Sequence, residues 1–210
     1  TALFEEVLRG ARDGYTIEKR FLRRRGEVLW ARLAAQAVRD EAGRVAYFTV
    51  LIEDVTARKR EEQLVQARLE LMDEAFGCTL QESLVRTLDK VEALTGSSIG
   101  FYHFVMEDEA TLTLQAWSTR TARDFCRAEG TGVHYPVAQA GVWADCIRQR
   151  GPVFHNDYRS MPGKKGMPPG HAEVLRELVV PVFRRGKIVA ALGVGNKAAD
   201  YTDEDVAVVT

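Results

Sequence analysis

Residues 178–195 read LVVPVFRRGKIVAALGVG, two apolar runs separated by an Arg185-Gly186 step. Valine-rich runs of this length around a two-residue turn with glycine are typical of a β-hairpin. Two further strand-like runs, residues 98–106 and 111–118, are joined by an acidic turn at residues 107–109. We therefore predict one antiparallel sheet in the C-terminal part of the chain.

Helical and irregular segments surround these strands. Apolar residues recur on one side of residues 80–94, which end at Thr95-Gly96, as in an amphipathic helix. Short helices are predicted around residues 121–128 and from Gly141 to Gln149, followed by a strand over residues 152–156. Residues 158–170 contain three prolines and three glycines and are predicted to form a loop. This mixture indicates an α+β fold around an antiparallel sheet.

The N-terminal part of the chain follows a different pattern. Residues 15–24, 27–39 and 44–54 are rich in β-branched and aromatic side chains and are separated by hairpin-sized breaks at Gly26 and Gly43. They predict three antiparallel strands. Residues 3–8 have apolar side chains at helical spacing and stop before Gly10, which predicts a short helix.

A charged, glycine-free stretch separates the two parts. It starts at Thr56, predicted as a helix N-cap, and runs to Gly77. Four apolar residues in it follow the 4-3-4 spacing of a coiled-coil seam: Val65, Leu69, Met72 and Phe76. We expect a homodimer through this helix, and the alternative is that the seam packs on the following domain.

Four segments of the N-terminal part resemble the C-terminal half of a PAS domain: YTIEKRF (15–21), RGEVLW (25–30), DEAG (40–43) and EDVTARK (53–59). The closing Asp-Val-Thr is similar to the PAS exit motif. The resemblance implies an antiparallel-sheet PAS fragment over residues 1–55 that is joined by a long linker helix, residues 56–76, to the C-terminal part of the chain.

Residues 77–210 resemble a GAF domain of the kind found in bacterial sensor histidine kinases and cyclic-di-nucleotide signalling proteins. The segments that carry the resemblance are AWS (116–118), HYPV (134–137), GVWADC (141–146), PVFHNDY (152–158), GH (170–171), VPV (180–182) and GVGNK (193–197). It implies a central antiparallel sheet flanked by helices and a cytoplasmic, non-enzymatic sensory module that relays to an output domain beyond Thr210. A histidine kinase of a two-component system and a diguanylate cyclase are both compatible outputs.

A small-molecule site is expected in this second module, with a ligand and cofactor that the sequence leaves unknown. Free amides at Gly141 and Val142 would meet a negative or carbonyl group, Trp117 and Trp143 would wall it, and the loop of residues 158–170 would close over it. The polar and aromatic side chains expected to complete the site are His155, Asn156, Asp157, Tyr158 and His171. Closure of this loop would shift the position of the linker helix, residues 56–76.

Other chemistries stay open as alternatives. Cys126 or Cys146 could serve a GAF-fold thiol enzyme similar to the reductases of free methionine sulfoxide, or the domain could be a ligand-free dimerisation scaffold. Neither cysteine precedes a histidine, as bilin attachment often requires, and a haem would use His134, His155 or His171. Asn196-Lys197, Tyr201 and Asp203-Glu204 are similar to a motif of cyclic-nucleotide-binding GAF domains. A structural interpretation is also available, with Thr202 and Asp205 capping the last helix and Lys197 balancing its acidic start.

The composition of the chain argues against nucleic acid and membrane lipid as binding partners. The 210 residues carry 29 Lys and Arg against 30 Asp and Glu, so the net charge near −1 offers no field for nucleic acid or anionic lipid, and no apolar run is long enough to span a membrane. The basic residues at 19–20 and 23–25 are interpreted as a solvated strand face. Three cysteines without a Cys-x-x-Cys spacing favour free thiols. With threonine first and the last helix unfinished, we expect a piece of a longer protein.

Overall fold

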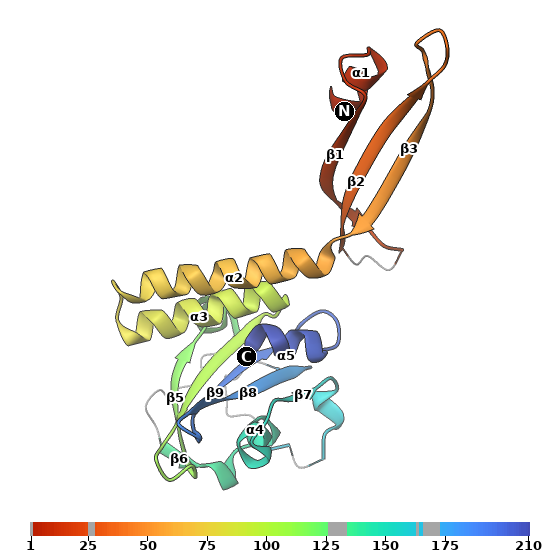
Figure 1. The fold of residues 1–210 in the computed structure, drawn as a ribbon. Coiled ribbons are helices and arrows are strands. Elements are labelled where there is room, and N and C mark those ends of the chain that lie inside the picture. The colour runs from red at the N-terminus through yellow and green to blue at the C-terminus, as the bar shows by residue number, and fades with distance from the viewer. Residues whose placement is uncertain (1, 25–27, 126–133, 163, 166–172) are drawn as a thin grey trace. The chain divides into compact units, whose positions relative to one another are not determined.

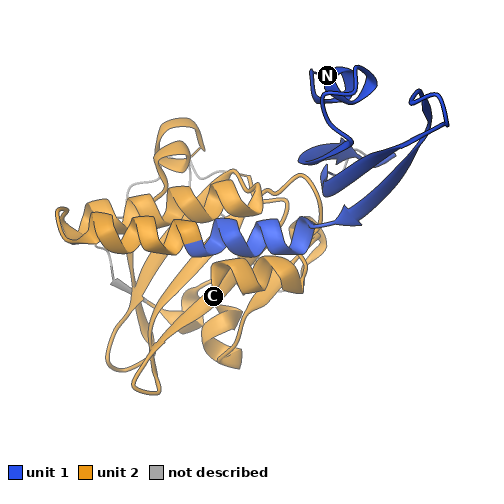
Figure 2. Ribbon diagram, turned by 45° about the horizontal axis from the view of Figure 1, so that its top comes forward, with its two compact units in different colours: residues 1–65 blue, residues 66–210 orange. Residues whose placement is uncertain are grey.

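The computed structural model describes residues 2–24, 28–125, 134–162, 164–165 and 173–210, apart from the side chains of Gln115, His134 and Tyr135. The chain forms two compact units, residues 1–65 and 66–210 (Figure 2). Each contains one antiparallel sheet (Figure 1).

The N-terminal unit is a three-stranded sheet with the order β1-β2-β3, and the three strands predicted from the sequence are confirmed. They are β1 (Gly14–Leu22), β2 (Val28–Arg39) and β3 (Val45–Asp54). The predicted short helix is α1 (Ala2–Leu8), whose Phe4 ring lies 5.1 Å from the ring of Phe48 on β3. Val7 of α1 is buried, as are Ala31 and Ala35 of β2, so helix and sheet both contribute to the small core of this unit.

Helix α2 (Thr56–Ala75) begins one residue earlier than its predicted cap implies. The carbonyl of Val55 accepts the first helical bond from the Lys59 amide at 3.0 Å. The Thr56 hydroxyl instead accepts a hydrogen bond from the Trp30 amide at 3.0 Å, while the Asp54 carboxylate accepts one from the Thr56 amide. The prediction of Thr56 as N-cap is therefore wrong, because its side chain ties the helix start to β2.

The four predicted seam residues of α2 are solvent-exposed. Their exposed fractions are 51% for Val65, 56% for Leu69, 65% for Met72 and 93% for Phe76. A different side of the helix contacts α3 (Leu80–Thr95): Glu74 pairs with Arg86 at 3.1 Å, Glu70 pairs with Lys90, and Ala67 is buried. The seam is thus not the face that α2 packs against α3.

The C-terminal unit is built on a six-stranded antiparallel sheet with the order β6-β5-β4-β9-β8-β7. The strands are β4 (Ile99–Val105), β5 (Thr111–Trp117), β6 (His134–Pro136), β7 (Val153–His155), β8 (Glu177–Arg184) and β9 (Lys187–Gly195). The predicted hairpin of β8 and β9 is confirmed, and both turn residues, Arg185 and Gly186, have positive φ.

One face of this sheet packs on α3 and α5 (Asp203–Val209), and its buried residues alternate with those of the other face. Helix α3 starts with a capping box between Thr79 and Glu82 and ends at Gly96 with φ 69°. The predicted capping box of Thr202 and Asp205 on α5 is confirmed. Lys197 Nζ lies 2.7 Å from both Asp205 carboxylate oxygens.

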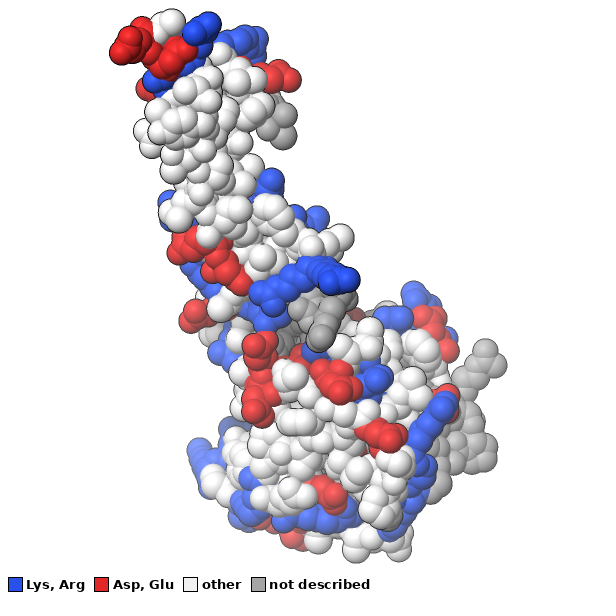
Figure 3. Space-filling view, turned by 90° about the vertical axis from the view of Figure 1, so that its right-hand side faces the viewer, with Lys and Arg blue, Asp and Glu red and all other residues white. Residues whose placement is uncertain are grey.

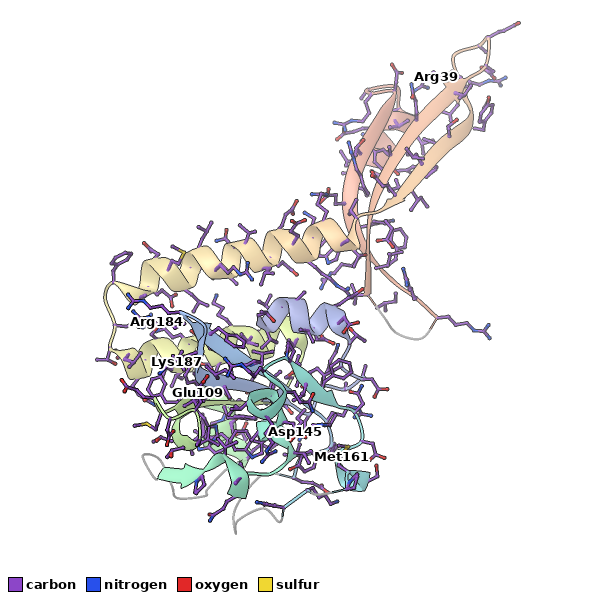
Figure 4. The ribbon with its side chains drawn as sticks, turned by 60° about the horizontal axis from the view of Figure 1, so that its bottom comes forward. Arg39, Glu109, Asp145, Met161, Arg184 and Lys187 are labelled. Carbon is purple, nitrogen blue, oxygen red and sulfur yellow. The ribbon has the colours of Figure 1, made fainter. Side chains whose placement is uncertain are left out.

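The opposite face, here called the site face, packs on short elements. They are two 3₁₀ turns, η2 (Val137–Gln139) and η3 (Val142–Ala144), and the helix α4 (Asp145–Gln149). The single helix predicted from Gly141 to Gln149 is wrong, since a 3₁₀ turn precedes a five-residue α-helix that begins at Asp145, labelled in Figure 4. Of the helix predicted over residues 121–128, the described part is the π-helical turn η1 (Thr121–Phe125).

Candidate ligand site

Four rings gather on the site face and form what we call the aromatic cluster: Phe101, His103, Trp117 and Trp143. The Phe101 ring contacts Trp117 and Trp143 edge-on, with centroids 6.3 and 5.8 Å apart, and His103 stacks on Trp143 at 4.5 Å. Phe101 and His103 alternate along β4, Trp117 ends β5, and Trp143 comes from η3. The two tryptophans predicted to line the site therefore lie on the same face, and both contact the ring of Phe101.

A buried polar pair lies on the same face of the sheet. His155 and Glu177 are register partners on β7 and β8, and His155 Nδ1 lies 2.9 Å from Glu177 Oε1. Glu177 alternates with Leu178, which faces α3 and α5, so its side chain shares the site face with Val179. The side chains of His155 and Glu177 are 12% and 3% exposed, so the pair is largely removed from water.

Burial and the charge of the pair together shift the pKa values of the groups on this face. The hydrogen bond to Glu177 raises the pKa of His155, although burial opposes this, and burial raises the pKa of Glu177. Burial and then the Glu177 charge raise the pKa of Cys146 to about 12 and that of Tyr158 to about 12. The thiol and the phenol are therefore neutral hydrogen-bonding groups near neutral pH.

Side chains of the site lie at ordinary contact distance from the backbone at Gly141. A Cβ placed on Gly141 would lie 3.4 Å from Trp143 Cδ1 and 3.7 Å from the Tyr158 hydroxyl oxygen. Arg148 donates to the carbonyls of Val137, Ala140 and Gly141, at 2.7, 2.9 and 3.1 Å, which holds this segment in place. Val142 is buried, and the turn it begins is too short to provide the predicted helix N-terminus for an anion.

Two of the predicted polar residues support the fold. The Asn156 side chain donates to the Tyr201 carbonyl at 3.0 Å and accepts from the Tyr201 amide at 2.7 Å. The exposed Asp157 carboxylate caps the turn η4 (Tyr158–Ser160), while Tyr158 itself is buried. His171 lies outside the described residues, as does much of the predicted lid. Ligand contacts by these residues stay a prediction.

Sequence reasoning missed Phe101, His103 and Glu177. Phe101 and His103 occupy alternate positions of a predicted strand, and that spacing was the available signal that they share a face. Glu177 precedes an apolar run and resembles an ordinary strand end. Its burial follows only from pairing with His155, 22 residues earlier in the chain.

The cysteines offer little support for thiol chemistry. Cys146 is buried with a raised pKa, the opposite of an activated thiolate, and Cys126 lies outside the described residues. Across the part of the chain that the structure describes, no group of three or more His, Cys, Asp or Glu side chains is placed to hold a metal ion. The described helices include none with both the length and the apolar character needed to cross a membrane.

The antiparallel sheet, with helices on one face and a polar and aromatic cluster on the other, is the α+β architecture expected from the sequence. Residues 79–210 match the family model described as GAF domain. The chain belongs to the GAF domain family, which confirms that part of the predicted resemblance.

Two curated relatives share part of the sequence. The "Methyl sulfide methyltransferase-associated sensor" of Methanosarcina acetivorans is 36% identical over 192 residues, which are 88% of this chain and 19% of that protein. The "Probable diguanylate cyclase DgcE" of Escherichia coli K12 is 40% identical over 81 residues, 37% of this chain and 7% of that protein. The chain thus spans about a fifth or less of each relative.

Solved structures share the fold at low sequence identity. The GAF domain of a phosphoenolpyruvate-protein phosphotransferase from Coxiella burnetii has a TM-score of 0.60 at 14% identity, covering 73% of this chain and 87% of that one. A free methionine-R-sulfoxide reductase from Neisseria meningitidis has a TM-score of 0.52 at 19% identity, covering 71% and 80%. At these identities the likeness concerns the fold alone.

Proposed function

We propose that this chain is a non-catalytic sensory region of a signalling protein, in which the GAF domain binds a small ligand on its site face. Residues 1–55 would be the second half of a PAS domain, and α2 would be the linker through which two copies associate. The Methanosarcina acetivorans relative, which is named as a sensor and is similar over 88% of this chain, supports the sensory role. A cytoplasmic location and an output such as a kinase or diguanylate cyclase belong to the same proposal.

The observation that carries the ligand site is that two kinds of group share one face of the sheet. The aromatic cluster offers flat apolar rings, and His155 and Glu177 offer largely buried polar side chains on β7 and β8, on the other side of β9. Apolar walls with a few fixed polar groups are the usual composition of a small-molecule site. Tyr158 adds a neutral hydroxyl close to Gly141 and Trp143.

The exposed seam of α2 supports the association of two copies. Val65, Leu69, Met72 and Phe76 keep coiled-coil spacing, each more than half exposed, while another side of the helix contacts α3. A second copy of the same seam would cover these side chains around a two-fold axis. Ligand binding could then bias the helix only through a difference in free energy between its two states.

The ligand site is tested by screening a metabolite panel by thermal shift and measuring the best binder by calorimetry. Trp143→Leu and His155→Asn should each weaken binding at least tenfold, whereas Trp30→Leu, in the other unit, should not. Equal affinity in all four proteins would move the site away from this face. A panel without any binder would favour the ligand-free dimerisation scaffold.

A further inference from the structure

In the described part of the chain, one ring nitrogen of His155 forms a hydrogen bond with Glu177, and the other forms none. An ionised Glu177 carboxylate can only accept, and in that state His155 Nδ1 carries the hydrogen of the 2.9 Å bond between them. In the part of the chain that the structure describes, this is the single hydrogen bond of the His155 ring. Nε2 lies across the ring from Nδ1, so it is left for another partner.

We propose that Glu177 is a positioning residue for the ligand: it fixes His155 so that Nε2–H is presented to a carboxylate or carbonyl-type oxygen of the bound molecule. This inference rests on the proposed ligand site and names the group that reads the ligand there. The anchor for an oxygen is then His155, in place of the helix N-terminus expected from the sequence.

The charges around the pair favour a doubly protonated ring. Asp145 at the start of α4 acts in the same direction as Glu177 on His155, raising its pKa, and Arg148 lies against Asp145. Among the described residues, the other titratable groups near Glu177 are the neutral Cys146 of α4, Tyr158 of η4 and Tyr201 after β9. With Nδ1–H held by Glu177, the added proton resides on Nε2, which becomes a donor.

The Nε2–H donor selects for an acceptor once a ligand covers it. A ligand group that removed Nε2–H from water without accepting its hydrogen bond would leave a polar group unpaired, so a ligand oxygen is favoured there over an apolar or cationic group of similar size. The aromatic cluster would contact the rest of the ligand. The ligand class is therefore a small compound with a carboxylate or carbonyl group and an apolar or planar body.

The positioning half can be tested without any ligand, by nitrogen-15 NMR of the histidine rings in the full chain, with His155→Asn to assign the signal. We expect neutral His155 to carry its hydrogen on Nδ1, and Glu177→Gln to lower the His155 pKa. Glu92→Gln is the matched control, because Glu92 is also buried but lies on α3. A neutral form with the hydrogen on Nε2 in the wild type, or an unchanged pKa in Glu177→Gln, would overturn the positioning role.

The recognition half is tested with two probes of opposite charge, acetate and tetramethylammonium. Acetate should shift the His155 Nε2 signal, and its affinity should fall as the pH rises through the His155 pKa. In Glu177→Gln, the affinity of acetate should no longer fall with this midpoint. Tetramethylammonium should leave the Nε2 signal in place. Absence of an acetate effect, or an equal effect of both probes, would overturn oxygen recognition by His155. The metabolite screen would then still test the ligand site separately. If a binder shifted the NMR signals of the Trp117 and Trp143 indoles but not that of His155, the ligand site would stand and only the role of His155 would be lost.

Discussion

The ring of Phe101 occupies the space that a side chain at position 193 would fill. Phe101 on β4 and Gly193 on β9 are register partners, and a Cβ built on Gly193 would lie 2.0 Å from Phe101 Cζ. The missing side chain at 193 therefore lets Phe101 lie over the sheet, where it contacts both Trp117 and Trp143. The aromatic cluster depends on this glycine.

Gly193→Ala should accordingly displace Phe101 and destabilise the domain by about 1–3 kcal/mol, the usual cost of overpacking a core. Chemical denaturation gives the free energy of unfolding, and tryptophan fluorescence reports the cluster. Gly77→Ala is the control, since a Cβ there would have nothing within 4 Å. Equal stabilities of the two variants would contradict the role given to Gly193.

Leu69→Lys should convert the proposed dimer into monomers in sedimentation experiments, because a charge would enter the apolar seam of α2. Leu69 is 56% exposed within one copy, so the substitution should leave the monomer fold intact. Gln63→Lys adds the same charge to an exposed position of α2 outside the seam and should leave association unchanged. A wild-type chain that sediments as a monomer at high concentration would remove the dimer from the proposal.

Glu92→Gln should flatten the pH dependence of stability. Burial raises the pKa of Glu92 above 4.5, although hydrogen bonds from Ser118 and Thr121 oppose the shift. The stability that its protonated form contributes is present below pH 4.5 and is lost as the pH rises through the folded-state pKa, by about 1.4 kcal/mol per pH unit in that window. Denaturation of both proteins across this range should show a smaller slope in the variant, and identical slopes would contradict the assignment.

Cys146 should resist alkylation in the folded protein, because burial raises its pKa to about 12. Cys78, which is partly exposed, should react with iodoacetamide first, as peptide mass spectrometry would show. The same burial argues against Cys146 as the nucleophile of a thiol enzyme. Turnover of free methionine sulfoxide that is lost in Cys146→Ser or in Cys126→Ser would instead establish the enzymatic alternative.

Local patterns were enough to predict most of the elements. The Arg185-Gly186 step marks the β8–β9 hairpin, and the apolar spacing before Thr95-Gly96 marks α3, because both signals lie within a few neighbouring residues. The three-residue edge strand β6 has no comparable pattern and was not predicted. The apolar spacing after Gly141 did not distinguish a 3₁₀ turn followed by α4 from one helix.

The candidate site was predicted less completely, for a physical reason. Trp117 and Trp143 were expected to share it, and they meet through Phe101. Asn156 was expected to face a ligand, yet its amide brackets Tyr201, 45 residues later. Whether a polar side chain serves the fold or a ligand depends on such distant partners, which single-sequence patterns do not contain.

The surface that Figure 3 displays carries charges of both signs. Lys and Arg are interspersed there with Asp and Glu. In the N-terminal unit, Arg58 pairs with Glu18 and Glu62, and Arg23 lies 3.2 Å from Asp54. Basic side chains that are paired in this way offer little net attraction to a polyanion.

Two glycines of β9, at positions 193 and 195, present no side chains to the site face. Side chains of the two flanking strands take this space: the Phe101 ring of β4 covers the main chain at Gly193, and Glu177 of β8 lies beside Gly195. Substitutions on these flanking strands could change the preferred molecule while every sheet hydrogen bond is kept. Proteins with this same backbone could then recognise chemically unrelated ligands and differ from one another at only a few side chains.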